Sequence, residues 1–163
     1  MNKLSVQVAV LTVACGAAFS AQAGEKLQFS SIAFGTSATE TRLELEGSHA
    51  YGTFSSDELV VSVDMPNSHP LQNLSGKCTG VAEKAGDSLK VSGHCVYSNP
   101  GGGKFALTFV VDPSLKPDWA GTFEMTGIDG NATGWKASCK WSPNVDFPGQ
   151  RYVSRWSCSA EKP

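Results

Sequence analysis

Four cysteines that follow residue 23 could form disulfides or hold a metal: Cys78, Cys95, Cys139 and Cys158. In an exported chain an even number of cysteines indicates disulfides, because the compartment beyond the membrane is oxidising. Zinc is the alternative, but no two of these cysteines form the Cys-x-x-Cys pair that is typical of zinc sites. We therefore predict two disulfides, no metal site and no cofactor.

The first disulfide follows from a turn signal. A two-residue hairpin loop at Gly86-Asp87 would place Cys78 directly opposite Cys95 on the two flanking strands. Counting outward from the loop puts the pair on a non-hydrogen-bonded rung, where Cα atoms lie about 4.5 Å apart, within reach of a disulfide. Glycine at the first loop position also suits a type II′ turn.

The second pair follows in the same way. A loop between residues 142 and 150 would join two strands that bring Cys139 opposite Cys158 and Trp141 opposite Trp156. Of the three possible connectivities we therefore predict the two hairpin pairs, both in a structural role. Neither pair has the short spacing of a redox-active dithiol.

Residues that could do acid–base or metal chemistry are few. His49, His69 and His94 lie far apart in the sequence, and the carboxylates of Asp57-Glu58 and Asp64 stand at strand ends or turns. Solvent-facing loop or strand positions are the favoured interpretation of the histidines, and strand-end or turn positions explain the carboxylates as well as catalysis does. Gly-x-Ser-x-Gly is absent, so no serine is marked as a nucleophile. No catalytic residue can be assigned.

Aromatic side chains are the more suggestive group. They lie mostly at alternating positions of neighbouring strands and would meet on one face. That face is either a filled core or the lining of a pocket for an apolar or ring-containing ligand. We predict ligand binding by Trp119, Trp135, Phe105, Phe123 and Tyr97.

Alternation with period two positions these residues. Apolar faces are formed by Leu59, Val61, Val63 and Met65, by Leu89, Val91, Gly93 and Cys95, by Phe105, Leu107, Phe109 and Val111, and by Trp119, Gly121, Phe123 and Met125. Each set indicates a strand with one buried and one wet face. No sustained helical period follows residue 23.

Clusters of Gly, Pro, Asn and Asp separate the strands. Strands are predicted near 26–34, 40–47, 50–55, 58–65, 74–83, 88–97, 103–112, 119–126, 134–142 and 150–159. One or two of these should merge, which leaves about eight to nine. Short sequential loops favour a single antiparallel up-and-down β-barrel, because closure removes exposed edges; a β-sandwich is the alternative.

The N-terminus has the form of a secretory signal peptide. Lys3 is followed by an apolar run over residues 8–19 and by a small-residue cleavage site at residues 21–23. We predict cleavage after the last of these. A lipidated Cys15 is the alternative, although Thr12 stands where such sites usually carry Leu.

Cleavage would leave residues 24–163, a length that suits one domain with a proper core. The chain has 13 basic and 15 acidic side chains, a net charge of −2, with the signs interspersed. No basic stripe for nucleic acid is present, and no second hydrophobic stretch could span a membrane. These features predict a secreted or periplasmic protein.

The second half resembles small exported bacterial proteins with an allene-oxide-cyclase-like or lipocalin-like barrel. The resemblance is carried by the glycines and cysteines of residues 76–80, 93–95, 102–105 and 120–127. In that group Gly-Thr-Gly-Lys-Phe is expected next, whereas residues 128–132 read Ile-Asp-Gly-Asn-Ala. The resemblance therefore implies a barrel and transfers no catalytic residue.

Three functions fit these observations. The first is a binding module that holds a small apolar ligand or an exported protein partner. The second is an enzyme acting on a hydrophobic small molecule, which would need a buried ionisable group in the pocket, with Asp64, His49 or His69 as acid or base. The third is a structural envelope protein with a filled core.

Overall fold

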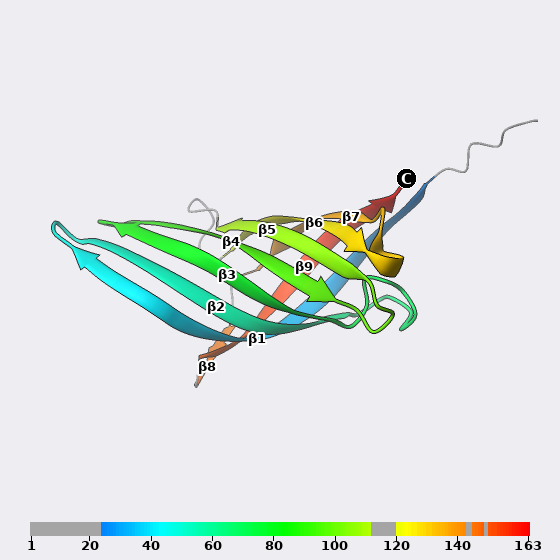
Figure 1. The fold of residues 1–163 in the computed structure, drawn as a ribbon, viewed down its shortest axis with the longest axis horizontal. Helices are drawn as coiled ribbons and strands as arrows, with labels where there is room; N and C mark the ends of the chain where they lie inside the picture. Colours follow the sequence, from blue (N-terminus) through cyan, green and yellow to red (C-terminus); the bar gives the residue numbers. More distant parts are fainter. Residues whose placement is uncertain (1–23, 112–119, 143–144, 149) are drawn as a thin grey trace, which may run out of the picture.

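The chain folds as one antiparallel sheet that closes on itself (Figure 1). The computed structural model describes residues 24–111, 120–142, 145–148 and 150–163. Its elements are β1 (Glu25–Leu45), β2 (His49–Ser62), β3 (Leu74–Ala85), β4 (Ser88–Ser98), β5 (Lys104–Val111), β6 (Gly121–Asp129), the 3-10 turn η1 (Gly130–Ala132), β7 (Lys136–Trp141), β8 (Val145–Phe147) and β9 (Arg151–Lys162).

Strand pairing establishes a closed barrel. Neighbours pair in sequence from β1 to β7, and β9 then pairs with both β7 and β1, which completes eight strands. The short β8 is a ninth strand, paired with the start of β9. The predicted all-β, up-and-down antiparallel barrel is confirmed. Among the described residues, no helix is long and apolar enough to cross a membrane.

Four predicted strands prove to be two long ones. β1 spans the predicted 26–34 and most of 40–47, and β2 spans 50–55 and most of 58–65. The pairing of β1 with β2 shifts register between Thr39 and Thr41, so the long strand is accommodated by a bulge instead of a break. Figure 1 shows β1 to β4 reaching past β5 to β7 at one end of the barrel.

Both predicted disulfides are confirmed. Ala85 pairs with Ser88 around the two-residue turn, where Gly86 has φ +59°, and Cys78 lies opposite Cys95 at a Cα separation of 4.0 Å. The φ of Gly86 is the positive value that the first position of a type II′ turn requires.

The second disulfide joins β7 and β9. Cys139 lies opposite Cys158 at a Cα separation of 4.1 Å, with Trp141 opposite Trp156. The prediction that residues 142–150 form one loop is wrong, because β8 lies within that segment and pairs with β9. A short strand of this kind carries too little alternation to be recognised in the sequence.

The apolar faces predicted for β4, β5 and β6 point into the barrel, but the one predicted for β2 points out. Leu59 and Val63 are 48% and 59% exposed, whereas Ser56 and Ser62 are buried. A polar network holds Ser62 inside, because its hydroxyl donates to the Leu71 carbonyl and lies 2.9 Å from the Ser31 hydroxyl. Alternation shows that a strand has two faces but not which face is buried.

One end of the barrel is closed by residues 63–73 and by η1. Gln72 bonds the backbone of Ser62 through its side-chain oxygen and nitrogen, which ties this loop to β2. Asn99 donates to the Pro70 carbonyl and to the Asn131 side chain, which joins the loop to η1. Behind these contacts lies a fully buried layer formed by Leu71, Leu74, Phe105, Met125 and Trp135. We call residues 63–73 the plug loop.

Candidate functional site

A cavity of about 610 Å³ occupies the barrel beyond that buried layer. Along β2 it is lined by Gly52, Phe54, Ser56 and Glu58, while Val60, the next inward residue, lies outside it. Glu58 therefore stands at the inner end of the cavity. At the other end the lining includes exposed residues, among them Arg151, so the described part of the chain leaves the cavity open there.

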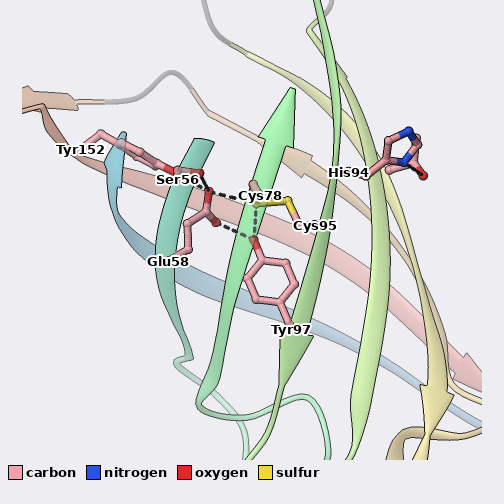
Figure 2. The surroundings of a disulfide bond; sticks show 8 residues. Ser56, Glu58, Cys78, His94, Cys95, Tyr97 and Tyr152 are labelled. Atoms are coloured by element: carbon pink, nitrogen blue, oxygen red, sulfur yellow. Dashed lines mark hydrogen bonds between the residues drawn. A yellow bond between two sulfur atoms is a disulfide. The ribbon is translucent and has the colours of Figure 1, made fainter. Parts of the chain in front are cut away.

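Three hydroxyl groups converge on the carboxylate of Glu58 (Figure 2). The hydroxyl of Tyr97 donates to Oε2 at 2.5 Å, and those of Tyr152 and Ser56 donate to Oε1, the latter at 3.2 Å. Both carboxylate oxygens accept, which is the pattern of an ionised carboxylate. The site is thus an anion held by three neutral donors.

Strand register explains how two tyrosines reach one carboxylate. Tyr152, Gly35, Glu58, Gly76 and Tyr97 form one row across β9, β1, β2, β3 and β4. A Cβ atom on Gly35 would overlap the ring of Tyr152, and one on Gly76 would overlap the ring of Tyr97. Because each glycine lacks a side chain, each ring lies over its neighbouring strand and brings its hydroxyl to Glu58.

Both tyrosines stay protonated over the physiological range. Burial is the main cause that raises the pKa of Tyr97 and of Tyr152, and the negative charge of Glu58 raises both pKa values further. An ionised phenol here would lose its hydration and face a carboxylate. The two hydroxyls are therefore available as hydrogen-bond donors, not as bases.

The first disulfide is part of the cavity wall. Cys78 and Cys95 both line the cavity, and the Sγ atom of Cys78 lies 3.5 Å from Glu58 Oε1 and 3.4 Å from the Tyr97 hydroxyl. A disulfide sulfur has no hydrogen to donate, so these are packing contacts. Cys139 and Cys158 are not among the residues that line the cavity.

A chain of six aromatic rings runs along the cavity wall. Its members, each in contact with the next, are Tyr97, Trp156, Phe123, Trp141, Phe109 and Phe54. Ring centroids lie 4.7 Å apart for Phe123 and Trp156, and 5.9 to 6.3 Å apart for the other pairs. We call this set the ring chain. It begins beside Glu58 at Tyr97.

Of the five residues predicted to bind ligand, only some line the cavity. Tyr97 and Phe123 line the cavity. Phe105 and Trp135 are buried in the layer behind it and do not line it. Trp119 lies outside the described residues. Ligand binding by any of them stays a prediction.

The histidines and aspartates considered as candidates for acid–base or metal chemistry lie away from the cavity. Asp57, Asp64 and His49 are exposed, and His94 faces outward from β4. His69 belongs to the plug loop, where its ring packs edge-on against a buried tryptophan. None of these five lines the cavity. In the described ranges, no group of three His, Cys, Asp or Glu side chains could hold a metal ion.

Sequence reasoning therefore named Glu58 only as half of an Asp57-Glu58 pair, and it missed Ser56 and Tyr152. The available signal was the row of glycines and tyrosines, but it becomes visible only when the register of five strands is known. A residue's neighbours across strands are fixed by that register, not by its neighbours in the chain.

Comparison with known proteins adds little to this description. No protein-family model matches the chain, and no curated protein is similar to it in sequence. Among solved structures, the chain is similar to one described as the pterocarpan synthase dirigent protein GePTS1. The TM-score is 0.49 and the identity 10%, over 85% of this chain and 92% of that one. The barrel is established by the chain's own strand pairing, and the likeness assigns it no family, ligand or activity.

Proposed function

We propose that this protein is an exported binding protein that holds a small apolar, ring-containing ligand inside its barrel. The observation that carries the proposal is the cavity of about 610 Å³ with the ring chain along its wall. Small-molecule sites typically have volumes of about 300–1,000 Å³ and mostly apolar walls with a few placed polar groups. Here Glu58 and its hydroxyl donors are those polar groups.

Export is the second part of the proposal. It is supported by the signal-like segment, residues 1–23, which lies outside the described residues, and by two disulfides, which persist mainly in oxidising compartments. The mature protein would be residues 24–163, in the periplasm or outside the cell. The sequence resemblance to allene-oxide-cyclase-like or lipocalin-like barrels agrees with a binding role, because eight strands enclose just enough space for one small ligand.

Filling the cavity tests the binding proposal. Leu107 is buried in the cavity wall on β5, and Val110 is 53% exposed on the outer face of the same strand. A neutral fluorescent probe, N-phenyl-1-naphthylamine, should bind saturably to the wild type and to Val110→Trp. We expect it to bind at least about tenfold more weakly to Leu107→Trp, because the larger side chain occupies the cavity.

Melting temperatures would show that all three chains are folded. Native mass spectrometry of the protein from the exported fraction would detect a ligand that purifies with it. Non-saturable binding by the wild type, or equal binding by both tryptophan variants, would overturn the proposal.

The second candidate function is an enzyme that acts on a hydrophobic small molecule in the barrel. Glu58 favours it specifically, since it is an ionisable group inside the cavity, in a place that Asp64, His49 and His69 do not occupy. A carboxylate beside two neutral phenols could take up and return a proton. A ligand recovered unchanged after prolonged incubation supports binding, whereas product that forms with wild type and not with Glu58→Gln supports the enzyme.

A further inference from the structure

The carboxylate of Glu58 lacks a cationic partner in the part of the chain that the structure describes. Each of the five ion pairs found there joins other residues. Its hydrogen-bond donors are the hydroxyls of Ser56, Tyr97 and Tyr152, which orient the carboxylate but bring no positive charge. Among the described residues, the negative charge at the inner end of the cavity therefore has no cation paired with it.

The surroundings of Glu58 strengthen the attraction of that charge for a cation. Tyr97 and Trp156 are buried, and Cys78 lines the wall on the β3 side, so apolar groups flank the half-buried carboxylate on its inner side. Charges interact more strongly where apolar groups replace water. Glu58 is half-buried, and partial removal of water from a carboxylate that has no cation beside it is unfavourable, so a cation brought by the ligand would offset that cost.

Arg151 is the other charged residue in the described lining of the cavity. It lies at the open end, where it is exposed, and its Nε donates to the Pro148 carbonyl at 3.0 Å. This bond directs the guanidinium toward the turn before β9. Water screens an exposed charge, so Arg151 leaves the charge of Glu58 in place.

The ring chain adds a second feature that suits a cation. Its first ring, Tyr97, bonds Glu58 and stands edge-to-face with Trp156, whose centroid lies 6.1 Å away. Aromatic faces carry negative potential and attract ammonium groups. The same rings also provide apolar contact area for the rest of a ligand.

We infer that the ligand is a small organic cation, an ammonium group with apolar or aromatic substituents. Its positive charge lies beside Glu58, and its substituents contact the ring chain. The inference rests on the proposed function: the substituents are the apolar, ring-containing part of the ligand proposed above, and the inference adds the ammonium group that they carry.

A matched pair of compounds tests the inference on the whole mature protein. Benzyltrimethylammonium and neopentylbenzene have the same shape and differ in one atom, a charged nitrogen in place of a carbon. In calorimetric titrations at low salt, wild type should bind the cation at least about tenfold more tightly than the hydrocarbon. In Glu58→Gln the ratio of the two affinities should fall to about one.

Asp57 supplies the matched control, because it is the neighbouring carboxylate on β2 and faces outward. Asp57→Asn should keep the preference of the wild type for the cation. A wild type that binds both compounds equally would overturn the inference and leave the proposed function standing. Because this comparison uses wild type alone, it tests the inference even if Glu58→Gln does not fold. Equal loss in Glu58→Gln and Asp57→Asn would also overturn it. If neither compound nor the neutral fluorescent probe binds, both proposals fail.

Discussion

The hydroxyl of Tyr152 donates to the carboxylate of Glu58 across a whole strand of the barrel. The strand between them is β1, and the residue in register with both is Gly35. Tyr97 reaches the same carboxylate across Gly76 on the opposite side. The site therefore depends on the lack of side chains at Gly35 and Gly76, as well as on the side chains of Glu58, Tyr97 and Tyr152.

Adding one methyl group at Gly35 should damage the site. In Gly35→Ala the new Cβ would overlap the ring of Tyr152, so the ring must move and its bond to Glu58 must lengthen or break. We expect a loss of about 1–3 kcal/mol of unfolding free energy, measured by denaturant titration. Gly52→Ala is the control, because the nearest atom to its Cβ would be the Thr41 carbonyl oxygen at 3.2 Å.

A double-mutant cycle would identify the cause of that loss. In a Tyr152→Ala background the obstructing ring is gone, so Gly35→Ala should cost little. Losses that simply add would show that the overlap with Tyr152 is not responsible.

Tyr97 and Tyr152 should make the protein unstable in alkali. Burial first, and the charge of Glu58 second, raise the pKa of both above the ordinary value of 10.0. The unfolded chain releases these protons near pH 10, whereas the folded chain retains them. Stability is therefore full below about pH 10 and falls above it, by up to about 1.4 kcal/mol per pH unit for each tyrosine.

Phenylalanine variants measure this effect, because phenylalanine keeps the ring but has no proton to release. Tyr152→Phe should reduce the slope of unfolding free energy against pH above about pH 10. Tyr51→Phe, at an exposed position, is the control and should leave the slope unchanged. Identical slopes in wild type and Tyr152→Phe would contradict the prediction.

Acid should weaken the plug loop through His69. The Nδ1 atom of His69 accepts a bond from the Leu71 N–H at 3.1 Å. Burial lowers the pKa of His69 below its ordinary value of 6.5, and Glu25, whose carboxylate lies 3.8 Å from Nε2, opposes this shift in part. Below about pH 6.5 the unfolded chain takes up a proton that the folded chain resists, so stability is full above that pH and falls as acid is added.

His69→Asn keeps a side-chain acceptor but cannot take up a proton in this range. Its melting temperature should fall less than that of wild type between about pH 8 and pH 5. His49→Asn, at an exposed site, should follow wild type. The prediction is wrong if all three proteins lose the same stability over this interval.

The two disulfides should contribute equally to stability but unequally to binding. They close loops of similar length, with sequence separations of 17 and 19, so removing either by paired Cys→Ala changes should cost about 3 kcal/mol. Only Cys78 and Cys95 line the cavity. Loss of this pair should therefore weaken the binding of the neutral fluorescent probe, whereas loss of Cys139 and Cys158 should leave it unchanged at temperatures where both variants are folded.

Features that depend on local geometry could be predicted from the sequence. The positions of Cys78 and Cys95 about Gly86-Asp87 determine a rung because hairpin pairing is counted outward from the turn. The buried faces of β5 and β6 could be predicted because large apolar residues such as Phe105 and Phe123 occupy every second position.

Features that depend on several strands at once could not be predicted from the sequence. The apolar residues Leu59 and Val63 face solvent, and Glu58 faces the cavity, because the inner side of β2 borders a partly open space instead of a filled core. A cavity tolerates a carboxylate that three hydroxyls can bond, whereas a packed core would not. The partner Tyr152 lies on the far side of β1 and almost a hundred residues along the chain.

Pairing between the first and last strands also determines when the site can exist during synthesis. Glu25 to Thr36 of β1 pair with Arg151 to Lys162 of β9, so the ribosome makes Gly35 long before Tyr152. Until β9 docks, one edge of β1 stays open and the carboxylate lacks one of its donors. Such long-range closure is slow, on the order of milliseconds to seconds. Binding competence should consequently arise in one late step of folding, and nascent or truncated chains should bind nothing.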